Sequence, residues 1–105
     1  MLSSKLVING LELDTKNFEV IRSGEIINLS KKEFSLLEFL MKNPGRVFNK
    51  EQLTERVWDY DSNVLPNTAQ VYLGYLRNKI DKAFPKEKPL INTVRGFGYR
   101  FGEKK

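Results

Sequence analysis

Cysteine and histidine are both absent from this chain of 105 residues. Without cysteine there is no disulfide framework, no thiol nucleophile and no thiolate metal site. Without histidine the chain lacks the most common general base and the most common metal ligand of proteins. These absences predict a protein that is not an enzyme and that needs no metal or other cofactor. The expected compartment is the cytoplasm.

A long hydrophobic run is missing as well. The longest apolar stretch, residues 34–41, is interrupted at Ser35 and Glu38, so no membrane-spanning segment is expected. Residues 1–5 do not have the basic and then apolar pattern of a secretory signal. With 40% hydrophobic and 11% aromatic residues, the composition predicts a folded core, and the length predicts a single domain over residues 1–105.

Positive charge is distributed unevenly along the chain. The formal net charge is +5, and residues 67–105 hold nine of the 18 basic residues but three of the 13 acidic ones. The last third therefore carries the whole positive excess. A basic region of this kind suits contact with a polyanion, although a solvated, lysine-rich surface has the same composition.

The first thirty residues have the pattern of a small antiparallel sheet. Asn9-Gly10 is a strong hairpin signal, and Ser23-Gly24 marks another turn. Alternating apolar and polar residues on either side of these turns are typical of half-buried strands. The expected strands, within a sheet over residues 5–29, are residues 5–8, 11–14, 18–22 and 26–29.

Two capped helices are expected in the middle of the chain, at about residues 30–43 and 49–58. Ser30 with Glu33, and Asn49 with Gln52, have the spacing of a capping box, in which each member bonds the main-chain N–H of the other. The first helix is apolar on more than one side, which predicts that it lies between two layers. Asn43-Pro44-Gly45 ends it.

The third helix is expected over about residues 67–83, because Pro85 forbids its continuation. Apolar residues spaced by four, three, four and three positions form its core-facing stripe, which consists of Ala69, Leu73, Leu76, Ile80 and Ala83. The opposite face carries Asn67, Val71, Gly74 and Asn78, flanked by Tyr75 and Lys82. An ordinary solvent face would show glutamate and lysine there, so this face is a candidate for contact with another molecule.

The chain closes with two β-prone runs around Arg95-Gly96-Phe97-Gly98, which predict a hairpin over residues 90–101. The Gly-x-Gly in its turn is too weak a pattern for a phosphate-binding loop, because no helix follows it.

The order sheet, helix, helix, loop, helix and hairpin predicts an α+β fold, a winged helix-turn-helix with a four-stranded N-terminal antiparallel sheet, three helices and a C-terminal β-hairpin wing. In that fold the third helix enters a DNA major groove while the wing reaches phosphates or the adjacent minor groove. Val71 would then meet a thymine methyl, Gly74 would allow close approach, and Arg95 would probe a narrow groove. The alternatives are that Val71 is a scattered surface residue, that Gly74 packs against another helix, and that Tyr75 is half-buried packing.

Several motifs, in order along about residues 6–101, resemble the OmpR/PhoB family of response-regulator effector domains. The matching segments are residues 29–37, 46–53, 57–58, 71–80 and 93–99. The resemblance implies specific binding of double-stranded DNA as the output domain of a two-component transcriptional regulator. We expect a domain that is monomeric off DNA and binds at tandem direct repeats. The candidate DNA-binding residues are Asn67, Thr68, Val71, Tyr72, Gly74, Tyr75, Arg77, Asn78, Lys79, Lys82, Thr93 and Arg95.

The resemblance also implies partners for the whole protein, namely an upstream receiver domain, a sensor kinase that phosphorylates it, and RNA polymerase. The loop from Trp58 to Pro66 corresponds to the family's transactivation loop. Its candidate polymerase contacts are Asp59, Tyr60, Asp61, Ser62 and Asn63. The two aspartates, in a turn without histidine or cysteine, are interpreted as solubilising residues and not as a metal or acid–base site.

The chain departs from the family at the base-reading positions. Many members have two basic residues where this chain has Gly74 and Tyr75, a histidine at Tyr72 and an arginine at Asn67. The cationic contacts are therefore expected to shift to Arg77, Lys79, Lys82 and Arg95. The alternative function is a winged-helix protein-interaction module without specific DNA readout, whose third helix docks a partner protein.

Overall fold

The computed structural model describes residues 4–58 and 64–102. Its first sheet is antiparallel, in the order β1-β2-β3-β4, from β1 (Lys5–Ile8), β2 (Leu11–Asp14), β3 (Glu19–Arg22) and β4 (Glu25–Ile26). The helices that follow are α1 (Lys31–Lys42), α2 (Lys50–Trp58) and α3 (Thr68–Leu76), which continues as the π-helical segment η1 (Arg77–Lys82). A second sheet, in the order β5-β7-β6, contains β5 (Val47–Phe48), β6 (Ile91–Val94) and β7 (Gly98–Phe101). The predicted winged helix-turn-helix architecture is confirmed.

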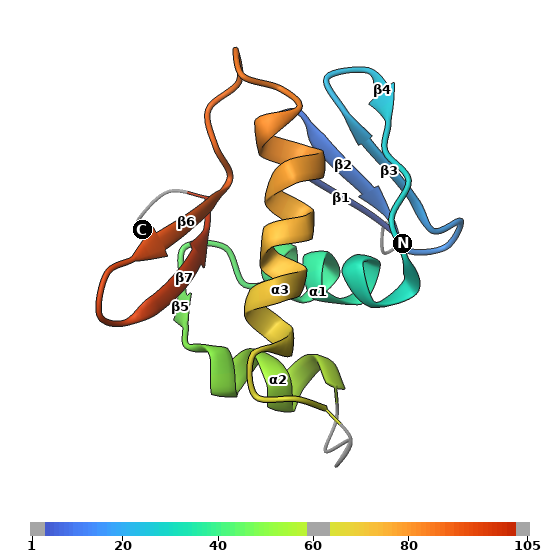
Figure 1. Cartoon of the computed structure of the whole chain (residues 1–105). Coiled ribbons are helices and arrows are strands. Elements are labelled where there is room, and N and C mark those ends of the chain that lie inside the picture. Colours follow the sequence, from blue (N-terminus) through green and yellow to red (C-terminus); the bar gives the residue numbers. More distant parts are fainter. Residues whose placement is uncertain (1–3, 59–63, 103–105) are drawn as a thin grey trace.

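The helix α3 runs between the two sheets, with β1–β4 on one side and the hairpin β6–β7 on the other (Figure 1). The helix α1 packs against α2, α3 and both sheets, as its apolar residues on several sides predicted. Its buried residues are Glu33, Phe34, Leu36, Leu37, Leu40 and Met41. The apolar stripe of α3 and η1 completes this core with Ala69, Leu73, Leu76 and Ile80.

Both predicted capping boxes are present. In α1 the Ser30 main-chain N–H donates to the Glu33 carboxylate at 2.7 Å, and the Glu33 N–H donates to the Ser30 hydroxyl at 3.3 Å. Asn49 and Gln52 exchange the equivalent bonds at 2.8 Å each. These bonds pair N–H groups that a helix start otherwise leaves without partners, so they explain where α1 and α2 begin.

Two features of the strands differ from expectation. The strand β4 is shorter than the predicted run 26–29, although the Ile27 N–H still donates to the Val20 carbonyl at 2.8 Å. The two-residue strand β5 was not predicted, and it joins the edge of the hairpin through Val47 and Phe48.

The strand β5 depends on Gly98, whose φ is +144°. A Cβ atom at this position would lie 2.2 Å from the Phe48 carbonyl oxygen, a distance that no side chain tolerates. The glycine therefore lets the hairpin approach the segment before α2 at close range.

The third helix also differs, because its last turns are π-helical and the predicted stripe residue Ala83 is exposed. At the end of this segment the main chain has other partners as well. The Ile80 carbonyl accepts a hydrogen bond from the Arg22 guanidinium at 2.8 Å, and the Phe84 N–H donates to the Asp81 carbonyl, three residues earlier, at 3.0 Å. A π turn contains more residues than an α turn, so positions after Ile80 leave the face that the α-helical spacing assigns to them.

Arg22, the last residue of β3, is buried, with 1% of its surface exposed. Its guanidinium donates to the Ile80 carbonyl and to the Lys88 carbonyl at 2.9 Å. It also forms an ion pair with Asp81 at 3.0 Å, and it lies over the Phe84 ring at 5.8 Å from the ring centroid. One side chain of the sheet thus binds the end of η1 and the loop that follows.

Asp81 connects the same point to the hairpin. One carboxylate oxygen accepts the Leu90 N–H at 2.9 Å and the other accepts the Ile91 N–H at 3.0 Å, where β6 begins. The side chain of Asp81 is only 7% exposed, so this charge depends on Arg22 and on these N–H groups in place of water.

Replacing Arg22 with methionine should destabilise the chain by about 3–5 kcal/mol, because it leaves the Asp81 carboxylate buried without its cation. Urea unfolding at neutral pH measures this. Lys42→Met is the matched control, since it removes the exposed i,i+4 pair with Glu38, and such pairs contribute about 0.5 kcal/mol or less. Equal losses in the two variants would contradict a central role for Arg22.

Candidate nucleic-acid interface

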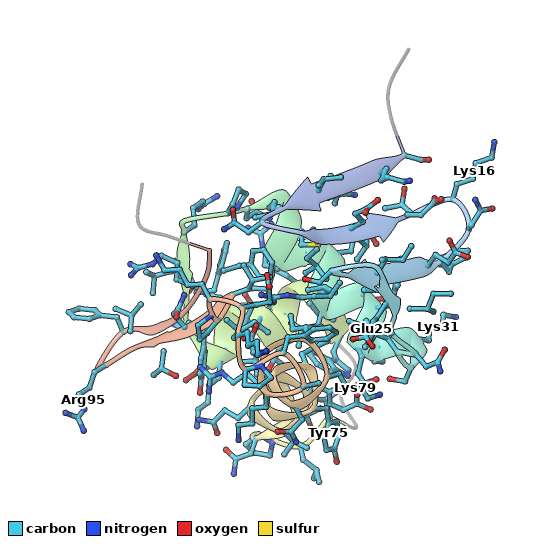
Figure 2. The ribbon with its side chains drawn as sticks, turned by 90° about the horizontal axis from the view of Figure 1, so that it is seen from above. Lys16, Glu25, Lys31, Tyr75, Lys79 and Arg95 are labelled. Carbon is cyan, nitrogen blue, oxygen red and sulfur yellow. The ribbon has the colours of Figure 1, made fainter. Side chains whose placement is uncertain are left out.

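The outer face of α3 is exposed, as the position of its apolar stripe predicted. Val71 is 46% exposed and Tyr75 48% exposed, on a helix whose inner residues are buried. Figure 2 shows Tyr75 at the outer edge of the molecule, away from the N-terminal sheet. The other exposed candidates of this face are Asn67 and Asn78, and Thr68 and Gly74 are partly exposed. Lys82 is exposed too, but it follows Ile80 in the π-helical segment, beyond the face that the α-helical spacing defines. The face offers amide, hydroxyl and apolar groups together.

Gly74 lies on this face without a packing partner. A Cβ atom added there would have nothing within 4 Å among the described residues. The alternative that Gly74 allows tight packing against another helix is therefore wrong. Because Gly74 has no side chain, the helix surface is shallowly depressed next to Tyr75, and another molecule can approach the helix backbone there.

Tyr72 is half-buried and connects this face to the core through ring contacts. Its ring lies 5.2 Å from the ring of Trp58 and 5.5 Å from that of Tyr75, both in edge-on arrangements. Aromatic rings favour such edge-on contacts over face-to-face stacking. Tyr72 therefore limits the orientations of Tyr75 and is itself a poor candidate for direct base contact.

Arg77 ties α3 to the hairpin. Its guanidinium donates to the Ile91 carbonyl at 3.3 Å and to the Thr93 hydroxyl, and it lies over the Tyr99 ring at 5.6 Å. The Gln70 amide donates to the Tyr99 hydroxyl at 3.2 Å. Two of the candidate residues, Arg77 and Thr93, thus bind one another and hold the wing beside the helix.

Lys79, although partly exposed, is also bound to groups of the protein. Its ammonium group donates to the Glu33 carboxylate at 2.8 Å and to the Asn28 carbonyl at 3.1 Å. Burial raises the pKa of Glu33, but the hydrogen bonds from Lys79 and Ser30 and the charge of Lys79 outweigh it, so the pKa lies below its usual range. Lys79 therefore serves the packing of α1 against η1, a role that sequence reasoning did not find.

The tip of the hairpin presents Arg95 and Phe97, which are both exposed. Figure 2 shows Arg95 at the far end of the hairpin. The turn is closed by a hydrogen bond from the Phe97 N–H to the Val94 carbonyl at 2.9 Å, and Gly96 supplies the positive φ of 84° that it requires. Phe97 was not among the predicted site residues, although an aromatic residue between two glycines of a surface turn was a visible signal.

The predicted polymerase-contact residues Asp59, Tyr60, Asp61, Ser62 and Asn63 lie outside the described residues. Over residues 4–58 and 64–102 no cluster of acidic side chains could hold a metal ion. No helix in the same part of the chain is long and apolar enough to cross a membrane.

Comparison with known proteins gives consistent matches. A family model described as "Transcriptional regulatory protein, C terminal" matches residues 24–101. The chain is 44% identical over 96 residues to the probable transcriptional regulatory protein TcrX of Mycobacterium tuberculosis, covering 91% of this chain and 40% of TcrX. It is 46% identical over 92 residues to the response regulator ArlR of Staphylococcus haemolyticus, covering 88% of this chain and 41% of ArlR. The chain thus spans about two fifths of the length of these relatives.

A solved structure is similar over nearly its whole length. It is the DNA-binding domain of RstA from Klebsiella pneumoniae in complex with the RstA box. The TM-score is 0.77 at 29% identity, and the match covers 93% of this chain and 96% of that chain.

The pair of Glu33 and Lys79 predicts how stability depends on pH. Because the folded pKa of Glu33 is below its ordinary value of 4.5, the pair stabilises the fold above that pH, and this contribution is lost as the pH falls through the folded pKa. Glu33→Gln should lower the free energy of unfolding at neutral pH by about 1 kcal/mol and make its decline below about pH 4.5 shallower.

Urea unfolding between pH 7 and pH 3 measures both effects. Glu38→Gln, on the same helix but in an exposed pair with Lys42, is the matched control and should change neither quantity much. An acid decline as steep in Glu33→Gln as in the wild-type chain would show that Glu33 is not the group responsible.

Proposed function

The chain belongs to the family of C-terminal domains of transcriptional regulatory proteins, the output domains of response regulators, and on this premise we propose how it binds DNA. The helix α3 lies in the major groove of double-stranded DNA and reads base edges. The hairpin β6–β7 reaches phosphates or the adjacent minor groove. The relatives and the RstA complex support this arrangement, and the residue assignments below are our own.

The observation that carries the proposal is the chemistry of the exposed face of α3. Val71 suits contact with a thymine methyl, since it is apolar and 46% exposed on a helix edge. The shallow depression at Gly74 lets α3 enter the major groove deeply. Exposed amides and a hydroxyl at Asn67, Asn78 and Thr68 can bond base edges or phosphate oxygens.

The cationic contacts are assigned to Arg95 and Lys82. Neither side chain has a polar partner among residues 4–58 and 64–102, and both are exposed. Arg77 and Lys79 are instead held by Thr93 and Glu33, so we assign them to positioning the wing and the helix. Arginine at the tip of a hairpin suits the negative potential of a narrow minor groove.

The family supplies the rest of the proposal for the whole protein. We infer an upstream receiver domain, phosphorylation by a sensor kinase, and action in the cytoplasm. Residues 59–63 are the candidate contact with RNA polymerase. Each chain presents one reading helix, so we infer that it is monomeric off DNA and that two copies bind a tandem direct repeat.

Duplexes selected from a random library with this chain should share a sequence, and two tandem copies should bind the chain more tightly than one. Titrations of one-repeat and two-repeat duplexes at several salt concentrations test this. The logarithm of the binding constant should fall linearly with the logarithm of salt concentration, by about 0.9 per phosphate neutralised.

The outcomes separate the parts of the proposal. Equal affinity for one and two repeats would contradict tandem binding alone. A shallow salt dependence with no preferred sequence would contradict DNA reading and favour the alternative, a module whose third helix docks a protein.

Val71→Ser should lower specific affinity without lowering stability, and Tyr75→Ala should lower it with a loss of stability of only about 1 kcal/mol, from the ring contact with Tyr72. Losing a contact with a base costs about 1–3 kcal/mol at the selected site, whereas binding to mixed-sequence DNA should hardly change because no charge is lost. Thermal melts and competition binding measure the two quantities. Val7→Ser is the matched control, since Val7 is 59% exposed on β1. Early melting with an unchanged ratio of specific to non-specific affinity would show that this face packs inside the protein.

A further inference from the structure

Phe97 exposes 75% of its surface at the tip of the hairpin. Phe18 is exposed to the same degree, at 74%, but its ring rests on the ring of Phe34 at a centroid distance of 5.4 Å. The ring of Phe97 has no aromatic or cationic ring contact within the described part of the chain. Singly exposed apolar side chains are common, so the exposure of Phe97 gains its meaning from the position of the ring beside Arg95 at the tip of the wing.

The hairpin beneath this ring is held on two sides. The hairpin is paired along one edge with β5, where the close approach of Gly98 to Phe48 leaves no space for slippage. Arg77 binds Thr93 and stacks on Tyr99 from the side of α3. The ring is therefore presented at a defined place, and its contacts with a partner would not require ordering of a mobile loop.

The ring also borders a hollow of about 290 Å³ between the start of α2, the start of α3 and the hairpin. Its lining combines polar side chains, among them Asn49, Gln70 and Thr93, and the Glu51 carboxylate with apolar surface that forms the larger share. A hollow with both kinds of surface suits a ligand that has both. The DNA backbone has this character, since each deoxyribose presents a hydrocarbon face between two phosphates.

We propose that Phe97 packs against the deoxyribose wall of the minor groove, next to the place where Arg95 enters. This inference rests on the proposed function. Arg95 supplies the electrostatic contact and Phe97 an uncharged contact from the same turn. Binding by the wing then depends on the width of the minor groove in two ways. A narrow groove has a more negative potential, which attracts Arg95, and only a groove of suitable width lets the Phe97 ring reach the sugar wall while Arg95 is inserted.

The experiment compares variants of the 105-residue chain on a short mixed-sequence duplex that accommodates one copy. Phe97→Ser should weaken binding about fivefold, since it removes roughly half of the burial free energy of a phenyl ring, and the salt dependence should keep its slope. Phe97→Leu should retain most of the affinity. Arg95→Ala should also weaken binding, but it should flatten the slope by about one unit.

Phe18→Ser is the matched control. It removes an equally exposed ring from the turn between β2 and β3. Figure 2 shows Lys16, which belongs to the same turn, at the opposite end of the molecule from Arg95. Its affinity should equal that of the wild-type chain, and thermal melts should show that Phe97→Ser folds normally.

Unchanged binding by Phe97→Ser would overturn the inference while leaving the proposed function intact. Weaker binding only on two-repeat duplexes would overturn it too, because the ring would then contact a second copy of the chain. If the wild-type chain and Phe18→Ser fail to bind any duplex, the proposed function itself fails.

Discussion

A buried guanidinium joins three parts of this molecule at one point. Arg22 ends a strand of the N-terminal sheet, yet its donors serve carbonyls at the end of η1 and in the loop before β6. Its partner Asp81 accepts the N–H groups with which β6 begins. Since a buried charge without its partner is strongly unfavourable, neither side chain can move alone. The sheet, the third helix and the first strand of the wing consequently keep one relative geometry.

The other edge of the wing is fixed by a steric condition. Gly98 lets β7 approach Phe48 so closely that no Cβ atom fits, and Arg77 binds Thr93 from the helix side. The hairpin is thus held by Asp81, by Phe48 and by Arg77. When α3 shifts, the hairpin moves with it and does not bend independently. In the proposed complex, contacts of the helix in the major groove and of the wing in the minor groove are therefore coupled, and DNA whose groove geometry suits one alone is disfavoured.

How much the sequence predicted depends on the distance between the residues involved. The capping boxes span three positions and the stripe from Ala69 to Ile80 repeats every three or four, so local chemistry was enough to locate the helices and the outward face of α3. Arg22 and Asp81 are 59 positions apart, and no local pattern pairs them. Lys79 looked like a surface cation for the same reason, because Glu33 lies 46 positions away. The strand β5 escaped prediction because two residues are too few to show a period.

Internal pairings reduce the number of cations that can face phosphates. Arg22, Arg77 and Lys79 bind groups of the protein, so three of the 18 basic side chains are directed inward, while the ion pairs with Asp81 and Glu33 cancel within the net charge of +5. Binding by one copy then depends more on uncharged contacts, and the attraction to DNA of any sequence is correspondingly smaller. In the proposed tandem binding, a low affinity of one copy would make occupancy depend on a second copy at an adjacent repeat, because joining two weak sites raises the effective concentration of each. An output domain with these properties leaves control of DNA occupancy to whatever brings two copies together.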